Sequence, residues 1–143
     1  MPFDGTGYEG RVEALGKMDK VIDLLSDERR WCKKRLQTFD GRRCILGAME
    51  AADATYVLKA PILRAIKQVT DRDYLRIEMF NDHPLTTHPL VVRVLHQARE
   101  TMLDDLAGRL AAREQRTADT RLGVLFKPAA YLHRILRTAH FGV

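Results

Sequence analysis

The stretch MFNDHPLTTH, residues 79–88, is the densest polar segment of the chain, and apolar residues flank it on both sides. Asn81 and Asp82 are strong turn and cap formers, because their short side chains accept hydrogen bonds from nearby backbone amides. Pro84 fixes the turn that follows. These residues therefore predict a tight turn with a structural role.

A long helix is predicted to begin at the end of this stretch. Thr87 can accept a hydrogen bond from an amide of that helix as its N-cap, and Pro89 suits a first turn, where its missing N–H loses nothing. Because the residue before a proline avoids α geometry, His88 is an alternative N-cap. Phe80 and Leu85 are predicted to point into the core as apolar plugs.

The same segment supports a second, catalytic interpretation. A cysteine nucleophile needs a nearby base, and a histidine base needs an orienting carboxylate or amide. Cys32 supplies the thiol and His88 the base. Asp82 or Asn81 supplies the orienting group of such a hydrolase or transferase. Asp82, His83 and His88 are also possible metal-ligand types, but no helix face aligns two histidines at this spacing, so we expect neither a metal nor another cofactor.

Apolar residues at spacings of three and four predict helices in most of the chain. The predicted helices cover residues 8–30, with the last five residues ending the helix, and residues 47–58, 60–70, 88–115 and 127–140. Pro61 suits the first position of its helix. Residues 71–82 are predicted to form a short helix with Leu75 and Met79 on one side, and a strand over residues 74–80 is the alternative.

Asp40-Gly41 is a strong hairpin signal, because a tight primed turn needs positive φ, which Asp-Gly tolerates. The flanking segments 34–39 and 42–46 are short. A two-stranded ribbon of this size is stable only when it lies on helices. The sequence therefore predicts a small hairpin that packs on a helical core.

The predicted fold class is mostly α, a single helical domain with a small two-stranded β-hairpin and a C-terminal helical extension. The helical core domain is predicted over residues 1–116, with the hairpin near 33–46. Residues 117–143 are predicted to form a basic linker and a C-terminal amphipathic helix. The predicted core contains Val21, Ile22, Leu25, Trp31, Ile45, Leu46, Ile66, Phe80, Val91, Leu95 and Met102.

The formal net charge of +5 is unevenly distributed along the chain. From residue 112 onward, six arginine and lysine residues stand against two acidic residues, a net +4. Basic side chains on one helix face can neutralise phosphates, and aromatic rings can stack on bases. A protein partner is expected, and nucleic acid or an acidic partner fits this basic helix; a solvated face and a membrane surface are the alternatives. The candidate partner-binding residues are Arg121, Lys127, Tyr131, Arg134 and Arg137.

Length and composition are those of a globular protein. The chain has 143 residues, of which 45% are hydrophobic, enough for one domain with a core. No apolar run approaches the roughly 20 residues that cross a bilayer, and the first ten residues do not resemble a secretory signal. We therefore expect a cytoplasmic protein in which Cys32 and Cys44 are thiols.

Three motifs resemble those of a family of small bacterial proteins of unknown function. They are Trp-Cys at 31–32, D-G-x-x-C-x-x-G-A at 40–48 and aromatic-N-D-x-P-x-x-T at 80–87. The resemblance covers residues 18–103 and implies a fold but no reaction. Leu90 stands where many relatives have an acidic residue. We expect a small bacterial interaction or regulatory module without catalysis, and the alternative is the cysteine-dependent hydrolase or transferase.

Overall fold

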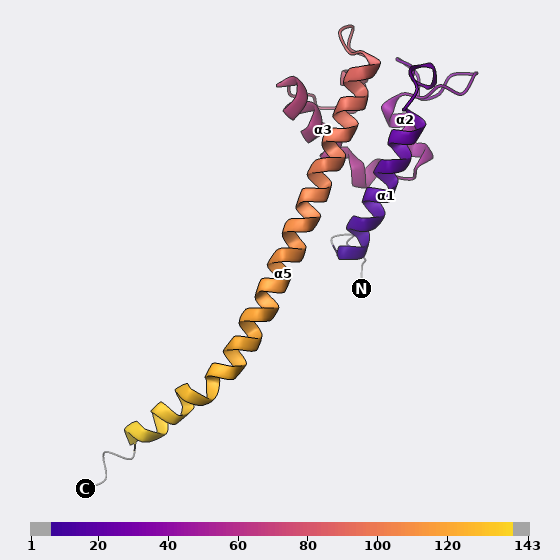
Figure 1. Cartoon of the computed structure of the whole chain (residues 1–143). Helices are drawn as coiled ribbons and strands as arrows, with labels where there is room; N and C mark the ends of the chain where they lie inside the picture. Colours follow the sequence, from indigo (N-terminus) through magenta and orange to yellow (C-terminus); the bar gives the residue numbers. More distant parts are fainter. Residues whose placement is uncertain (1–6, 139–143) are drawn as a thin grey trace. The chain divides into compact units, whose positions relative to one another are not determined.

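The computed structural model describes the backbone of residues 7–138 and the side chains of residues 7–123. Five α-helices and one short 3₁₀ helix make up this part of the chain (Figure 1). They are α1 (Tyr8–Leu24), η1 (Glu28–Arg30), α2 (Ile45–Ala51), α3 (Thr55–Thr70), α4 (Ile77–Asn81) and α5 (His88–Thr138). The chain divides into two compact units, Met1–Leu106 and Ala107–Val143, and α5 contributes to both.

Buried apolar residues recur every three or four positions along the helices of the first unit. Leu15, Met18 and Val21 are buried on α1, and Leu58 and Ile62 on α3. This spacing places one face of each helix in the core. Each large side chain that is fully buried there stabilises the fold by about 1.5–3 kcal/mol.

The mostly helical prediction is confirmed, and the predicted core agrees with the observed one. Seven of the eleven predicted core residues are buried: Val21, Leu25, Ile45, Ile66, Phe80, Val91 and Leu95. The other four, Ile22, Trp31, Leu46 and Met102, are partly buried and pack against the core. Among the described residues, the last buried position is Ala98, so the core belongs to the first unit.

The predicted two-stranded hairpin is wrong, because no strand forms anywhere in residues 7–138. A turn at its centre does form. The Gly41 N–H donates to the Thr38 carbonyl at 3.0 Å, and the Thr38 N–H donates to the Arg42 carbonyl at 2.8 Å. Gly41 has a φ of +88°, which glycine adopts without strain. A turn therefore forms where the Asp-Gly signal predicted one, but its centre is Phe39-Asp40 and only Gly41 has a positive φ, so it is not the primed turn that was expected.

Backbone pairing beside this turn stops after one bridge, between Gln37 and Arg43. Arg43 also pairs with the segment after η1: its N–H donates to the Arg30 carbonyl at 2.8 Å, and its carbonyl accepts from the Cys32 N–H at 3.1 Å. The next residues enter α2 at Ile45. The Cys44 carbonyl, which a longer ladder would pair with the Leu36 N–H, accepts instead from the Ala48 N–H of α2 at 2.9 Å, so the pairing ends after one bridge.

Helix α3 begins at Thr55, so Pro61 lies inside it and not at its first position as predicted. A proline within a helix removes one backbone hydrogen bond, here the one to the Val57 carbonyl. Leu58 and Ile62, which flank this point, are fully buried. Their burial offsets the lost hydrogen bond, and α3 continues through the proline.

Residues 77–81 form helix α4, in agreement with the prediction of a helix over a strand. Its buried face differs from the predicted one. Leu75 and Met79 are exposed, whereas Ile77 and Phe80 are buried. Leu75 precedes the helix, so its spacing of four from Met79 does not define a helix face.

Helix α5 runs without a break through residues 117–123, where a linker was expected. This stretch contains no proline, and its threonine hydroxyls are satisfied within the helix. Thr117 Oγ1 donates to the Arg113 carbonyl at 2.9 Å, and Thr120 Oγ1 donates to the Arg116 carbonyl at 2.8 Å. Polar residues that predicted a loop are therefore accommodated on a helix surface.

Candidate functional site

Asn81 is fully buried at the end of α4, and its whole side chain is hydrogen-bonded. Its Oδ1 accepts from Trp31 Nε1 at 2.9 Å and from the Ile45 N–H at 3.2 Å. Its Nδ2 donates to the Cys32 carbonyl at 3.1 Å and to Asp82 Oδ1 at 2.8 Å. A side-chain amide has two donor hydrogens and two acceptor lone pairs. Asn81 therefore has no capacity left for a ligand.

Two further contacts connect the same segments. The Asp82 carboxylate accepts from the Lys34 N–H at 2.7 Å, and Lys34 has a φ of 64°, in the left-handed region. Lys33 Nζ donates to the His83 carbonyl at 2.7 Å. Together with Asn81, these bonds hold the segment after η1 against the end of α4. The segment between η1 and α2, which forms no β-ladder, is thus stabilised by hydrogen bonds of side chains.

The two threonines of the polar stretch hold the start of α5. Thr86 is buried, and its Oγ1 donates to the Phe80 carbonyl at 2.7 Å. Thr87 Oγ1 accepts from the Leu90 N–H at 3.4 Å. Thr87 is therefore the N-cap, and His88, the alternative, is the first residue of the helix.

His88 joins the end of α1 to the start of α5. Its buried Nε2 lies 2.7 Å from the Leu25 carbonyl, so the ring proton resides on Nε2. The ring centroid is 6.0 Å from that of Trp31. His83 has a separate role, because its Nδ1 accepts from the Leu85 N–H at 3.1 Å. In the described part of the chain, no group of three His, Cys, Asp or Glu residues is arranged to hold a metal ion.

The two cysteines are free, buried thiols with structural contacts. Cys32 Sγ donates to the Arg35 carbonyl at 3.4 Å. Cys44 is the N-cap of α2, and its Sγ accepts from the Gly47 N–H at 3.3 Å. Burial raises the pKa of both thiols above the usual value. A nucleophilic cysteine needs the opposite shift, because the thiolate is the reactive form.

Gly47 allows the loop backbone to approach α2 closely. A Cβ at this position would lie 1.9 Å from the Leu36 carbonyl oxygen. The same oxygen accepts from the Cys44 N–H at 3.2 Å, so it cannot move away without losing that bond. The glycine of the D-G-x-x-C-x-x-G-A segment therefore has a packing role.

Three of the four candidate catalytic residues, Cys32, Asn81 and Asp82, lie together, and apart from the bond that Asn81 accepts from Trp31 Nε1 their hydrogen bonds are with the backbone or with each other. Asn81 connects Cys32 to Asp82, while His88 contacts Leu25 and Trp31. Within the described residues, no hydrogen bond joins His88 to the Cys32 thiol.

Of the five candidate partner-binding residues, one lies in the part of α5 whose side chains are described, and four lie beyond it. Arg121 is exposed. The side chains of Lys127, Tyr131, Arg134 and Arg137 lie outside the described residues, although the helix backbone continues to Thr138.

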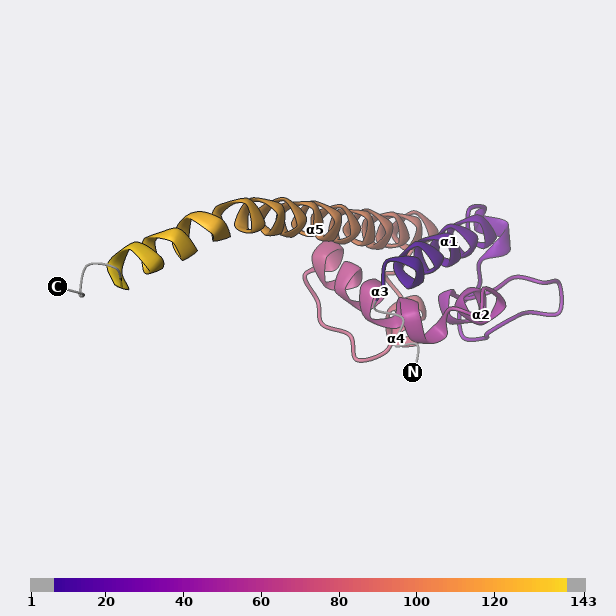
Figure 2. The ribbon, with the colours of Figure 1, turned by 90° about the horizontal axis from the view of Figure 1, so that it is seen from below.

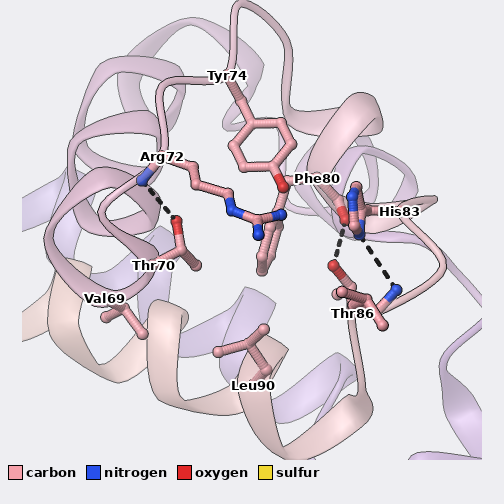
Figure 3. Close-up of a pocket in the computed structure, with 9 residues that line it drawn as sticks. Val69, Thr70, Arg72, Tyr74, Phe80, His83, Thr86 and Leu90 are labelled. Atoms are coloured by element: carbon pink, nitrogen blue, oxygen red, sulfur yellow. Dashed lines mark hydrogen bonds between the residues drawn. The ribbon is translucent and has the colours of Figure 1, made fainter.

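An open pocket of about 240 Å³ lies beside the polar stretch, and Arg72 and Tyr74 line it together with His83 (Figure 3). The Tyr74 ring packs edge-on against Phe80 and His83, with centroid distances of 5.7 and 6.3 Å. Leu85, a predicted core residue, is exposed at the pocket. A guanidinium, a phenol and an imidazole can all donate hydrogen bonds to a small carboxylate or phosphate.

Sequence reasoning missed Arg72 and Tyr74 as pocket residues. They stand in a connecting segment with no motif, between α3 and α4. The pocket exists because His83 and Leu90, from beyond that segment, return beside it. No signal near residue 72 could have indicated this arrangement.

These observations define a small helical domain whose densest polar residues hold its segments together. The chain belongs to the family of unknown function DUF6197, which matches residues 11–101. The match lies within the first compact unit, and residues from Ala107 onward lie outside it. A search of curated proteins and a search of solved structures each found no match to this chain. No helix among the described residues has the length and apolar character that a membrane span requires.

Proposed function

We propose that this chain is an interaction module without catalysis, and that it binds an acidic partner through the part of α5 that follows residue 106. The observation that supports the proposal is the exposure of this helix. Every residue from 107 to 123 is exposed. An isolated helix is marginally stable in water, and most helices are stabilised by packing one face. A helix of this kind therefore gains stability when a partner covers it.

The charge of this region favours an acidic partner. Residues 107–143 hold seven arginine and lysine residues and two acidic residues, so the whole net charge of +5 belongs to them. Arg109, Arg113 and Arg116 follow one another at spacings of four and three and share one helix face. No ion pair of the described residues includes them. Their charges are thus free to meet phosphates or carboxylates.

The same proposal extends along the helix to the candidate partner-binding residues Arg121, Lys127, Tyr131, Arg134 and Arg137. Arg121 follows the three arginines in the exposed stretch. The other four residues enter the proposal through the sequence alone.

The cysteine-dependent hydrolase or transferase receives less support. It requires a thiolate at Cys32 and a His88 base in contact with it. Burial raises the pKa of the Cys32 thiol, and among the described residues this thiol is hydrogen-bonded to the Arg35 carbonyl and not to His88. A bacterial, cytoplasmic setting remains an expectation from the sequence.

Charge reversal tests the proposal. In the full chain, Arg109, Arg113 and Arg116 are changed to Glu, and binding to labelled duplex DNA and to polyglutamate is measured by fluorescence anisotropy. We expect the wild type to bind at least one probe, the affinity to fall steeply between about 50 and about 200 mM salt, and the variant to lose binding. A matched control reverses Lys20, Lys59 and Arg93, three exposed basic residues of the first unit. Equal losses in both variants, or no binding to either probe, would overturn the proposal.

Deletion provides a second test. Buried residues end at Ala98 within the described chain, so removing residues from about 118 onward should leave the first unit folded. Circular dichroism should retain a cooperative thermal transition, while binding to the acidic probe should be lost. A truncated chain without such a transition would mean that the removed segment completes the core.

A further inference from the structure

Residues 33–43, between η1 and α2, form a protruding loop that we call the basic loop (Figure 2). The first unit as a whole, residues 1–106, is electrically balanced, with seventeen basic and seventeen acidic residues. The basic loop departs from this balance: it holds five basic residues, Lys33, Lys34, Arg35, Arg42 and Arg43, and one acidic residue, Asp40. The loop therefore carries a local net charge of +4, five basic residues minus one acidic residue, on a unit that is neutral as a whole.

An aromatic ring stands at the tip of the basic loop. Phe39 is 109% exposed, the highest exposure among the large hydrophobic residues described. It occupies the second position of the turn that the Gly41 N–H closes on the Thr38 carbonyl. A ring in this position contributes nothing to the core, so its side chain is available to a partner.

The turn that carries Phe39 is ordered by its own side chains. The Arg42 N–H donates to Thr38 Oγ1 at 3.0 Å, and the Asp40 carboxylate binds the Thr38 hydroxyl and, at 3.2 Å, Arg42 Nε. Asp40 is thereby paired within the loop. Because the turn is preorganised, a partner that contacts Phe39 does not have to order it, and this lowers the entropic cost of binding.

Two arginine residues line a hollow together with the ring, and Lys34 lies on the same loop. Lys34 and Arg35 take part in no ion pair of the described side chains. An open hollow of about 450 Å³ lies on the loop, and Phe39, Arg35 and Arg42 are among its lining residues. This volume is within the range of sites that hold small ligands. The loop thus combines a flat apolar surface, space beside it, and guanidinium groups.

We propose that the basic loop binds single-stranded nucleic acid, with the Phe39 ring stacked on a base and Lys34 and Arg35 paired with backbone phosphates. Stacking on an aromatic side chain requires a base whose face is open, as in a single strand and not within a duplex. Arginine and lysine beside such a ring track the phosphates of the same strand. The proposal concerns the first unit and does not depend on the role of α5.

An anionic membrane surface fits the basic loop less well. Interfacial binding buries several apolar side chains at one depth. At the tip, Phe39 is followed directly by the carboxylate of Asp40, and the next exposed apolar residue, Leu36, lies three positions away and is 45% exposed against 109% for Phe39. A single ring next to a negative charge suits one base better than a lipid layer.

The test uses the full chain and a labelled oligo(dT) strand of about 16 nucleotides, a length that spans one typical single-strand site. We expect Phe39→Ala to weaken binding about tenfold, in line with the loss of one stacked base. Lys34→Ala with Arg35→Ala should weaken binding and reduce the slope of log affinity against log salt by about 1.4. Vesicles of mixed phosphatidylserine and phosphatidylcholine provide the membrane arm.

Matched controls come from elsewhere on the first unit. Tyr56→Ala removes a second exposed ring, 98% exposed, and Lys59→Ala with Arg93→Ala removes two exposed cations. Both controls should bind like the wild type. The proposal is overturned by failure of the wild type to bind the strand at about 50 mM salt, by unchanged binding of Phe39→Ala, or by binding to the vesicles in preference to the strand. If only the α5 charge-reversal variant lost binding to the strand, the basic-loop proposal would be overturned and the proposed function would stand.

Discussion

The polar stretch 79–88 and the basic loop 33–43 touch each other but use their polar residues in opposite ways. In the polar stretch, Asn81 is fully buried and all its hydrogen-bonding groups have protein partners. In the basic loop, Lys34 offers its backbone N–H to Asp82, while its side chain takes part in no ion pair of the described residues. The stretch with the highest density of polar residues, 79–88, therefore contains residues that stabilise the fold.

The difference teaches where to look for binding in this chain. A side chain whose donors and acceptors are all engaged within the protein cannot recognise a ligand without breaking those bonds, at about 1–3 kcal/mol for each buried group left unpaired. An exposed ring or guanidinium without protein partners carries no such cost. The basic loop and the exposed part of α5 meet this condition, and the Asn81 cluster does not.

The largest expected effect at a polar residue is that of Asn81→Ala. The substitution leaves Trp31 Nε1, the Ile45 N–H and the Cys32 carbonyl without their partner, and we expect the free energy of unfolding to fall by about 4 kcal/mol. Urea denaturation followed by circular dichroism measures this change. The matched control is Gln97→Ala, since the Gln97 amide bonds lie nearer the surface, and it should cost less than about 0.5 kcal/mol. Equal losses would mean that Asn81 is not the link between the two regions.

Gly47→Ala should be the next most destabilising change. Its Cβ would lie 1.9 Å from the Leu36 carbonyl oxygen, so the loop must shift, and we expect a loss of about 3 kcal/mol. Gly16→Ala is the control, because nothing lies within 4 Å of a Cβ at that position in α1. It should stabilise the protein by up to about 1 kcal/mol through helix propensity. Chemical denaturation compares the two variants, and a neutral Gly47→Ala would contradict the observed approach.

The cysteines should react slowly. Because burial raises the pKa of the Cys32 and Cys44 thiols, we expect alkylation by iodoacetamide at neutral pH to be at least about tenfold slower than that of a free thiol. Mass spectrometry of the two peptides provides the rates. Rapid, selective alkylation of Cys32 would instead support the hydrolase or transferase.

The same pKa shifts predict a loss of stability at alkaline pH. A thiol whose pKa is raised by folding stabilises the protein below its unfolded pKa, near 9.0, and this contribution disappears as the pH rises through the folded-state pKa. The free energy of unfolding should therefore fall above about pH 9. The decline should be less steep in Cys44→Ala. Each protein is compared with its own free energy of unfolding below about pH 9. An identical slope in both proteins would show that the thiol does not contribute.

Thr87→Ala should cost about 1 kcal/mol, the usual loss for an N-cap hydroxyl. The hydroxyl accepts from the Leu90 N–H at the start of α5. Thr87→Ser keeps the acceptor and should retain most of the stability. Thermal unfolding of the three proteins measures the difference, and a Ser variant as unstable as the Ala variant would argue against capping.

Phe39→Ala should have the smallest effect on stability, below about 0.5 kcal/mol, because the ring is fully exposed. Phe80→Ala, at a phenylalanine of the polar stretch, should cost about 3–5 kcal/mol because that ring is buried in the core. Denaturation of this matched pair separates the two regions most directly. A costly Phe39→Ala would place the ring against the protein and remove it from any binding surface.

The helices and most of the core were predictable from the sequence because the signal is local. Val21, Leu25, Val91 and Leu95 recur at helical spacing, and such spacing determines which face can be buried. A turn near Asp40-Gly41 was predictable for a similar reason, since glycine adopts positive φ without strain, although the primed type that was expected did not form. The break expected in α5 was wrong, because threonine side chains that favour loops can also bond to the preceding helical turn.

The roles of the polar residues were decided only by the tertiary structure. Asn81 bonds to groups near residues 31 and 45, and no local pattern shows that those segments meet. The hairpin stops after one bridge because the next backbone groups are engaged elsewhere: the Ile45 N–H donates to Asn81 Oδ1, and the Cys44 carbonyl accepts from the Ala48 N–H of α2. Residue types and spacing determined which groups had to be satisfied. Which partners satisfied them depended on contacts across dozens of residues, because a buried polar group pairs with whatever the packing of the helices brings within reach.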